Sequence, residues 1–329
     1  MKYRTLGKSG INVSEIGFGA WTIGLDWWGK KIDDDEAITM LKRAYDLGIN
    51  FYETADMYGK GKSERLMAQA FKDMRDEVIY STKWGYDMYG AQQIGHSELP
   101  QKHDPEFLQF ALGKSLERLQ KDYVDVYSLH NPKMAAIKND ALFAALDDLV
   151  AKGRIKSHGA ALGPAIGWKE EGLEAIRSRN ITCLQTVYNI LEQDPGRDFI
   201  REAERHNVGI IVRVPDASGL LTGKVTADTK FDKNDHRSFR KQEFIMEAMQ
   251  KIENLKPIAK DKGWNITELA IKFILSQKQI SVVLPTMISM EEIEMFASLS
   301  DGKYLNTSEA ASVEQMYEKN FYVQPVASK

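Results

Sequence analysis

The sequence has only one cysteine, Cys183, in 329 residues. A lone cysteine excludes an intrachain disulfide, and because Cys183 lies within an apolar run we expect an inert core thiol. Apolar runs of 18 or more residues are also absent, and no apolar leader follows Met1. We therefore expect a cytoplasmic, soluble chain without a membrane-spanning helix.

Neither sign of charge is in large excess. The formal net charge is −3, and acidic and basic residues are mixed along the chain. Nucleic acids and anionic membranes bind strongly basic surfaces, so neither is an expected partner. The sequence also has no P-loop, no Ser–His–Asp arrangement and no ligand spacing typical of a metal site. We expect a small-molecule substrate, no metal, and a monomer or small homo-oligomer.

What the sequence does contain is a repeated alternation of short apolar segments with amphipathic, helix-like segments. Eight such pairs begin at Ile16. Without a linker or composition break, they predict an α/β fold with a parallel (β/α)8 barrel, formed as a single domain over 1–329 with a C-terminal helix and tail from about 302. The strands are expected at 16–20, 49–53, 78–83, 124–130, 155–161, 181–187, 208–214 and 281–284.

The alternative to a barrel is a doubly wound open sheet. That fold carries Gly-x-Gly-x-x-Gly after its first strand, and this chain has no such motif there. Residues 3–6 and 11–14 flank a turn and predict an N-terminal hairpin. The connections at 84–103 and 216–239, after strands three and seven, are too long for plain turns and are expected at the catalytic face.

Residues that suit proton transfer stand where three successive predicted strands end. The second strand ends on Glu53, with Tyr58 five residues later, the third ends on Lys83 and the fourth on His130. A nearby ammonium lowers the pKa of a phenol, and a carboxylate holds the ammonium in place. Together the four groups predict a device that donates a proton to a carbonyl oxygen during hydride reduction. Each also has a structural alternative, as a helix cap, a wall residue, a solvated strand end and a buried polar residue, respectively.

Four motifs resemble the aldo-keto reductases, over nearly the whole chain. Residues 48–59 are similar to the family pattern Gly-Ile-Asn-Phe-(Phe)-Asp-Thr-Ala-x-x-Tyr-Gly, and 81–83 resemble its third-strand lysine motif. Residues 121–130 resemble its Asp-Tyr-x-Asp-Leu-x-x-x-His signature, and 219–224 resemble the branch of bacterial inositol-operon and general-stress reductases. The resemblance implies a (β/α)8 barrel, a nicotinamide cofactor and the catalytic tetrad Glu53, Tyr58, Lys83 and His130.

The chain departs from the family pattern at three strand ends. Glu53 stands where the family has Asp, so its carboxylate lies about 1.5 Å further out, and we expect a retuned pair with Lys83. Residues 159–162 lack the Ser and Asn that hold the nicotinamide carboxamide in many relatives. Gln185 matches the remaining carboxamide ligand, with a core amide as the alternative. Arg213 takes the place of a stacking aromatic residue, with a structural salt bridge as the alternative.

The stretch after the last strand bears on the adenosine end of the cofactor. No Lys or Arg occurs from Gln279 to Gly302, and Glu292 stands where relatives that prefer NADP carry Arg. A carboxylate there repels a 2′-phosphate, so the pattern favours NAD(H) over NADP(H). The pyrophosphate is expected at 218–222 and near 286–287. The full set of expected cofactor contacts is Trp21, Gln185, Arg213, Ser218, Gly219, Leu220, Thr222, Pro285, Thr286, Met287 and Glu292.

These patterns predict an NAD(P)(H)-dependent oxidoreductase that acts on a small aldehyde, ketone or sugar, with Tyr58 as general acid or, in reverse, general base. Trp27, Trp28 and Trp84 are expected on loops at the barrel mouth, as walls of the substrate pocket. One alternative is a nicotinamide-binding sensor or regulatory subunit, because the potassium-channel β subunits resemble reductases. Another is an isomerase barrel that binds no nicotinamide.

Overall fold

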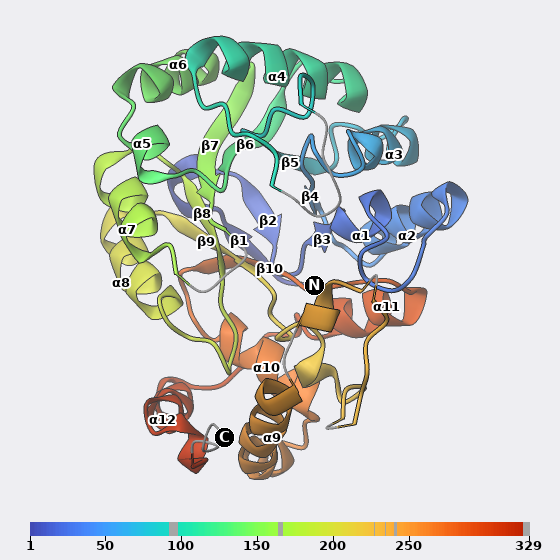
Figure 1. Ribbon diagram of the computed structural model, residues 1–329, viewed down its shortest axis with the longest axis vertical. Coiled ribbons are helices and arrows are strands. Elements are labelled where there is room, and N and C mark those ends of the chain that lie inside the picture. Colours follow the sequence, from blue (N-terminus) through green and yellow to red (C-terminus); the bar gives the residue numbers. More distant parts are fainter. Residues whose placement is uncertain (92–97, 164–166, 227, 234, 240–241, 325–329) are drawn as a thin grey trace.

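A computed structural model describes residues 1–91, 98–163, 167–226, 228–233, 235–239 and 242–324. Its strands β3 to β10 form one parallel sheet in chain order, and helices surround the sheet (Figure 1). The sheet curls until its ends meet: the Gly17 amide donates to the Val283 carbonyl at 2.9 Å, and the Val283 amide donates to the Glu15 carbonyl at 2.8 Å. The predicted (β/α)8 barrel is confirmed.

The strands are β1 Tyr3–Thr5, β2 Asn12–Ser14, β3 Phe18–Gly19, β4 Phe51–Glu53, β5 Ile79–Trp84, β6 Val124–His130, β7 Ile155–Ala161, β8 Cys183–Val187, β9 Gly209–Arg213 and β10 Ile280–Leu284. The α-helices are α1 Trp21–Gly24, α2 Asp34–Asp46, α3 Lys62–Ala70, α4 Pro105–Leu119, α5 Met134–Ile137, α6 Asp140–Ala151, α7 Lys169–Ser178, α8 Gly196–His206, α9 Gln242–Asp261, α10 Ile266–Leu275, α11 Met290–Ser298 and α12 Thr307–Glu318. The short 3-10 helices within the described residues are η1 Gly7–Ser9, η2 Leu220–Thr222, η3 His236–Phe239 and η4 Asn320–Tyr322.

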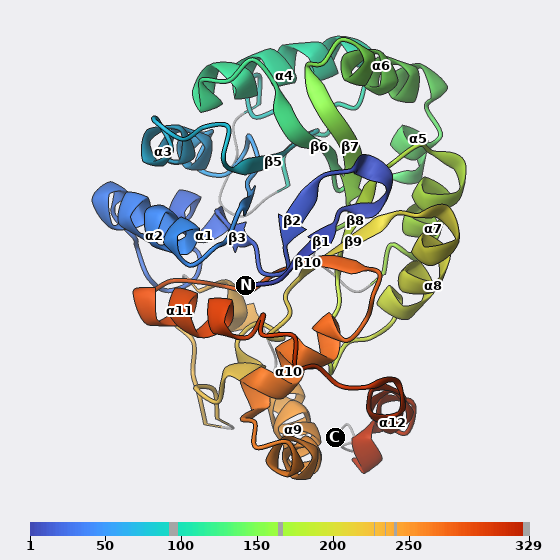
Figure 2. The same ribbon diagram turned by 180° about the vertical axis from the view of Figure 1, so that it is seen from behind.

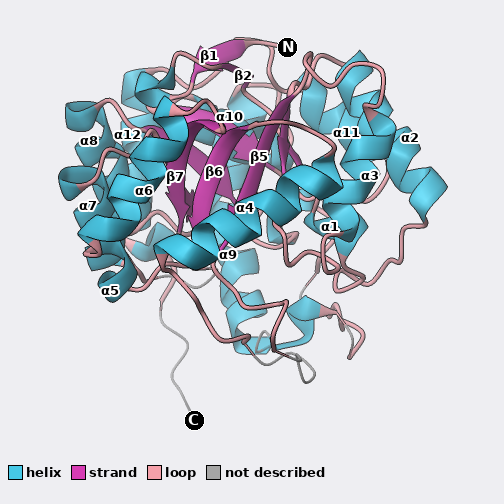
Figure 3. Ribbon diagram, turned by 90° about the horizontal axis from the view of Figure 1, so that it is seen from above, coloured by secondary structure: helices cyan, strands magenta, loops and turns pink. Residues whose placement is uncertain are grey.

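The predicted N-terminal hairpin is confirmed. β1 and β2 pair antiparallel, and the hairpin lies across one end of the barrel (Figure 2). Figure 3 shows the hairpin at one end and the long loops at the other. Leu6 and Val13 from this region are fully buried against the barrel interior, so the hairpin closes the end opposite the long loops.

The barrel interior is a small apolar core of its own. Its members come from the hairpin and from alternate strand positions: Leu6, Val13, Phe51, Val126, Cys183, Ile211, Val282 and Leu284. Cys183 is buried there, and burial raises the pKa of its thiol to about 12. The expected core position of Cys183 is therefore confirmed, and its burial agrees with an inert thiol.

Two short helices were not expected. α1 begins in the tryptophan-rich segment that the sequence indicates as a loop, and α5 follows β6. Each has only four residues, too few for a 3.6-residue periodicity to show in the sequence. None of the described helices is long and apolar enough to cross a membrane.

Candidate active site

Strand alternation directs five polar side chains to one place. Successive residues of a strand point to opposite faces, so a residue two or four positions after a core residue points into the barrel as well. The inward-facing core residues Phe51, Ile79, Val126, Cys183 and Ile211 are followed in this way by Glu53, Lys83, His130, Gln185 and Arg213. All five stand at or near the carboxyl ends of their strands, where (β/α)8 enzymes hold their active sites.

Lys83 is the centre of this group. Its side chain is only 1% exposed, forms an ion pair with Glu53, and donates to the Thr54 carbonyl at 2.6 Å. A buried ammonium is stable only with such partners. The expected pairing of Glu53 with Lys83 is therefore present in the structure, on neighbouring strands β4 and β5.

Tyr58 reaches the same site from the loop after β4. The Lys83 ammonium lies 4.8 Å from the centroid of its ring, and the His130 ring centroid lies 6.0 Å away. The loop is held close to α1: a Cβ on Gly59 would stand 2.4 Å from the Gly24 carbonyl oxygen, and the φ angle of Gly59 is +60°. Only glycine tolerates both conditions, and this close approach fixes the position of Tyr58.

Burial governs the acidity of Tyr58. It raises the pKa of the phenol above its ordinary value and outweighs the opposing effect of Lys83, while Glu53 raises the pKa further and Arg213 lowers it. Lys83 lowers the pKa as expected, but the net shift of the Tyr58 pKa is upward, because the sequence does not show how completely the ring is buried. The Tyr58 phenol is therefore protonated at neutral pH.

His130 is neutral at the same pH. Burial, and then the positive charges of Lys83 and Arg213, hold its pKa well below the ordinary value. A neutral imidazole both donates and accepts hydrogen bonds. The site thus combines a protonated phenol, a neutral imidazole and a paired ammonium.

Gln185 has a partner that the sequence did not reveal. Its Nε2 donates to Glu53 Oε1 at 2.9 Å, across the barrel from β8 to β4, which are four strands apart in the sheet. The sequence predicted Gln185 as a cofactor ligand, with a core amide as the alternative, and neither prediction includes this contact. The longer side chain of Glu53, in place of the family's Asp, was the one signal for a wider reach.

Tyr86 is a second aromatic neighbour of the imidazole that sequence reasoning missed. Its ring centroid lies 5.1 Å from that of His130. The hydroxyl donates to Glu98 Oε1 at 2.8 Å and accepts from Asn131 Nδ2 at 2.8 Å. Burial raises the pKa of this phenol to about 12. Tyr86 lies in the long loop after β5, and no sequence pattern singles it out.

The four tryptophans that were expected at the site divide into two groups. Trp21 packs edge-on against Tyr58, Trp27 and Trp28, with ring centroids 6.0–6.2 Å apart. These rings form one aromatic cluster beside the phenol. Trp27 and Trp28, which were expected at the barrel mouth, thus lie near Tyr58 through Trp21, and their role as walls of a substrate pocket stays a prediction.

Trp84 lies elsewhere, which corrects the expectation that it stands on a mouth loop. It is the last residue of β5 and is 0% exposed. Because Lys83 points into the barrel, the next residue points outward to the helices. Its ring stacks on Tyr127 at 6.0 Å and contacts His103. Trp84 therefore belongs to the outer core and not to the mouth.

The residues expected to hold the pyrophosphate form a tight turn after β9. Val214, Ala217, Ser218 and Gly219 all have positive φ angles. The Asp216 carbonyl accepts from the amides of Gly219 and Leu221, each at 3.1 Å, and Leu220–Thr222 form η2. The turn is thus held by its own backbone hydrogen bonds.

The remaining expected cofactor contacts are Pro285, Thr286, Met287 and Glu292, which follow β10. Thr22 Oγ1 donates to the Met287 carbonyl at 3.0 Å, so this segment is tied to α1. Glu292 Oε1 pairs with Lys224 at 2.6 Å, and its Oε2 accepts from the Ile288 amide at 2.9 Å. Lys224 comes from the loop after β9. It is therefore a basic residue near Glu292 that lies outside the stretch 279–302, in which the sequence has no Lys or Arg.

Among the described residues, no group of three or more His, Cys, Asp or Glu side chains is arranged to hold a metal ion. The polar residues at the strand ends are instead an amine, an imidazole, an amide, a guanidinium and one carboxylate. Such a set matches hydrogen-bonding and proton-transfer chemistry.

Comparison with known proteins agrees with this geometry. The model of the Aldo/keto reductase family matches residues 15–318. A probable voltage-gated potassium channel β subunit of Oryza sativa subsp. japonica is 30% identical over 301 residues, covering 86% of both chains. The NADH-specific methylglyoxal reductase of Escherichia coli (strain K12) is 27% identical over 330 residues, covering 97% of this chain and 99% of that one. The solved glycerol dehydrogenase of Gluconobacter oxydans superposes with a TM-score of 0.82 at 23% identity, covering 99% and 98%.

Proposed function

Because this chain belongs to the aldo/keto reductase family, we propose that it is an NAD(P)(H)-dependent oxidoreductase of small aldehydes, ketones or sugars, with Tyr58 as its proton donor. The nicotinamide, when bound, supplies or receives the hydride. The observation that carries the proposal is the buried Lys83–Glu53 pair, with the ammonium 4.8 Å from the Tyr58 ring. The motif at 219–224 further favours the branch of bacterial inositol-operon and general-stress reductases.

Tyr58 donates its hydroxyl proton to the carbonyl oxygen as the carbonyl carbon receives the hydride, and the product is an alcohol. Burial keeps the phenol protonated at neutral pH, which suits reduction. Lys83 stabilises the phenolate that forms, and Glu53 holds Lys83 in place. His130, neutral at this pH, orients the carbonyl oxygen. In alcohol oxidation the same groups act in reverse, with the phenolate as base.

The cofactor would lie along the rim from β8 to β10. Gln185 and Arg213 would hold the nicotinamide end, with Trp21 beside it. The turn that contains Ser218, Gly219, Leu220 and Thr222 would lie against the pyrophosphate. The segment of Pro285, Thr286 and Met287 would also contact the pyrophosphate, and Glu292 would face the adenosine end. Trp27 and Trp28 would wall the substrate pocket.

We propose that NAD(H) is preferred to NADP(H). Glu292 forms an ion pair with Lys224, so a 2′-phosphate has to compete with a carboxylate for this ammonium group. The E. coli relative, whose name states that it is NADH-specific, is consistent with this preference. Steady-state kinetics with both cofactors test it, and a large preference for NADPH would refute it.

A sensor or regulatory subunit is the second candidate. The 30% identity to a probable potassium channel β subunit favours it, as does the Glu in place of Asp at position 53. The retained Tyr58, Lys83 and His130 favour the enzyme, because a pure sensor needs no proton donor.

Two measurements, made one after the other, distinguish the two functions. Fluorescence titration with NADH and NADPH shows binding, and turnover with a panel of small aldehydes, ketones and sugars shows catalysis. The enzyme predicts both. Binding without turnover on any compound favours the sensor, and failure to bind either nucleotide refutes both functions.

A further inference from the structure

We infer that Gln185 is a positioning residue of the proton-transfer site: by its hydrogen bond to Glu53, it sets the acidity of Tyr58. The inference rests on the proposed function, since it concerns the same site. It goes beyond cofactor binding because it links the amide at the nicotinamide end to the group that transfers the proton.

One carboxylate oxygen carries the link. Glu53 Oε1 accepts from Gln185 Nε2 at 2.9 Å and also from the Lys83 ammonium. All three side chains are buried, where electrostatic interactions are stronger than in water. A change in one of these hydrogen bonds therefore alters the other.

The link depends on the length of Glu53. An aspartate at this position would withdraw its carboxylate by about 1.5 Å. The distance to Gln185 Nε2 would then exceed the range of a hydrogen bond. Glu53, in place of the family's Asp, thus adds a contact from β4 across the barrel to β8.

The direction of the effect follows from the charges that face Tyr58. Lys83 and Arg213 lower its pKa, Glu53 raises it, and the neutral His130 ring lies against it. The N–H dipole of Gln185 offsets part of the negative charge on Glu53. Removal of the amide leaves that charge more effective, so the Tyr58 phenol becomes a weaker acid.

The other end of the Gln185 amide is its acceptor atom, Oε1. Within the described ranges, no group donates a hydrogen bond to Gln185 Oε1, whereas its Nε2 is bound to Glu53. The neighbouring strand β7 ends in Ala160 and Ala161, followed by Leu162, and these side chains have no polar group. Gln185 Oε1 is therefore an acceptor for an amide N–H of the nicotinamide carboxamide. One side chain would thus contact both the cofactor and the catalytic pair.

The test compares Gln185→Leu in two backgrounds, the natural chain and Glu53→Asp. The readouts are kcat for alcohol oxidation and for carbonyl reduction, each as a function of pH, and the Kd of NADH. Below the pKa of Tyr58, the oxidation rate follows the fraction of phenolate. In the natural background we expect Gln185→Leu to slow oxidation by about threefold or more, equivalent to about half a pKa unit, with a smaller effect on reduction. In the Glu53→Asp background, we expect no such difference between oxidation and reduction.

Thr186→Val is the matched control, because it removes one buried polar group from the adjacent position of β8 and does not contact Glu53. We expect it to leave the ratio of oxidation to reduction unchanged. An equal effect of Gln185→Leu in both backgrounds would overturn the inference. So would a higher Kd without any change in the ratio, since Gln185 would then act only as a cofactor ligand.

Failure of the proposed enzymatic function can be told apart from failure of the inference about Gln185. If the natural chain binds NADH but converts no substrate, the enzyme proposal fails and the acidity of Tyr58 still decides the inference. Nuclear magnetic resonance of ¹³C-labelled tyrosine, with Tyr58 assigned by Tyr58→Phe, follows that titration directly. We expect the Tyr58 signal of Gln185→Leu to begin to move at a higher pH than in the natural chain. Coincident titrations would contradict the inference.

Discussion

Glu53 is the residue whose exact length matters most. The sequence correctly predicted that it pairs with Lys83, because both stand at the ends of neighbouring strands. It did not reveal the contact with Gln185, which is 132 positions away in the chain. Such a contact depends on how far two side chains extend across the barrel, and strand alternation alone does not give that distance.

The first prediction concerns the charge at position 53. Glu53→Gln leaves the buried Lys83 ammonium without its ion-pair partner, so we expect kcat to fall by about tenfold or more. Glu53→Asp keeps the charge, and we expect kcat within about threefold of the natural chain. Steady-state turnover of both variants, with circular dichroism to confirm folding, measures this. A Glu53→Gln variant as active as the natural chain would exclude the ion-pair role.

A second residue, Asp56, makes stability depend on pH. It is fully buried, and desolvation raises its pKa well above the ordinary value, with Glu64 adding to the effect. Below the pKa of the unfolded state, the carboxyl is protonated in both states, so its ionisation does not lower the free energy of unfolding. As pH rises past that value, the unfolded state ionises first, so stability is lost up to the folded-state pKa.

Asp56→Asn should remove this loss. We expect Tm to rise by about 2 °C or more at pH 7.5 and to change less near pH 4. Scanning calorimetry at the two pH values measures the difference, with the exposed Asp228→Asn as control. An equal change in Tm at both pH values would show that ionisation of Asp56 does not affect stability.

At the scale of elements, the strands were predictable and the loops were not. Each predicted strand is present, because a buried strand leaves a continuous apolar run bounded by turns. Tyr86 and Lys224 lie in long loops, where no period fixes direction. The position of Trp84 was wrong because β5 extends one residue beyond the predicted strand: Lys83 faces the barrel, so Trp84, the last residue of β5, faces the helices.

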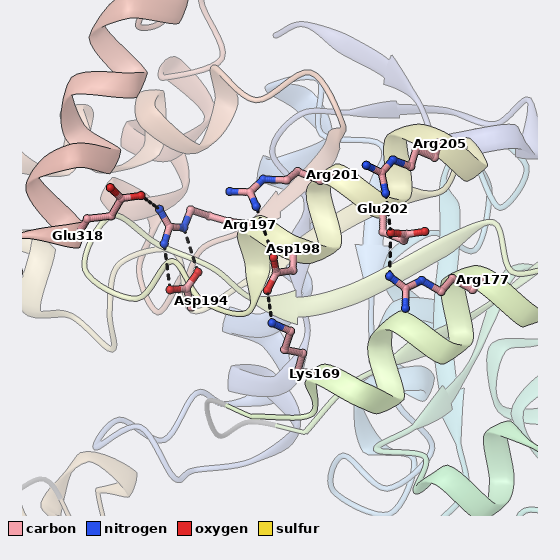
Figure 4. Close-up of polar contacts among 9 residues, drawn as sticks. All are labelled: Lys169, Arg177, Asp194, Arg197, Asp198, Arg201, Glu202, Arg205 and Glu318. Atoms are coloured by element: carbon pink, nitrogen blue, oxygen red, sulfur yellow. Dashed lines mark hydrogen bonds and ion pairs between the residues drawn. The ribbon is translucent and has the colours of Figure 1, made fainter.

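The outer helices α7, α8 and α12 are joined by ion pairs, which Figure 4 shows. Most involve exposed side chains and contribute little. Arg197 differs: its side chain is 14% exposed and contacts both Asp194 and Glu318. Its guanidinium also lies 5.0 Å from the centroid of the Tyr317 ring. This one residue therefore ties α8 to the C-terminal helix α12.

We expect Arg197→Met to lower the free energy of unfolding by about 1–3 kcal/mol, because it leaves a bidentate pair and an aromatic contact unmade. Arg201→Met on the same helix is the matched control. Arg201 is 65% exposed, and its contact with Asp198 is longer, at 3.5 Å. We therefore expect its substitution to lower the free energy of unfolding by less than about 0.5 kcal/mol. Urea unfolding measures both variants. Equal losses would show that Arg197 has no special role in holding α12.

The Lys224–Glu292 pair joins the loop after β9 to α11. Glu292→Gln releases Lys224 and removes the negative charge, so we expect the preference for NADH over NADPH to fall by about tenfold. The ratio of kcat/KM for the two cofactors measures this. Lys224→Met is the companion variant, and it should not increase the use of NADPH. An unchanged ratio in Glu292→Gln would mean that this pair does not select the cofactor.

At the scale of the whole molecule, the barrel explains why distant motifs form one site. Parallel strands deliver their carboxyl ends to a single rim, so Glu53, Lys83, His130 and Gln185 converge although they span more than a hundred positions of the chain. The fold was predictable because eight repeated units define it. Oligomeric state and substrate leave no such repeated pattern, and the expectation of a monomer or small homo-oligomer stays a prediction.

The central claim is that Tyr58 transfers the proton in a carbonyl reduction. The most direct test compares Tyr58→Phe with the natural chain, with NADH affinity and turnover of a reactive small aldehyde measured on the same preparations. Phenylalanine keeps the ring that packs against Trp21 and His130 and removes only the hydroxyl. We predict that kcat falls by about a hundredfold or more, while the Kd of NADH stays within about twofold. A Tyr58→Phe variant that retains its turnover would contradict the account.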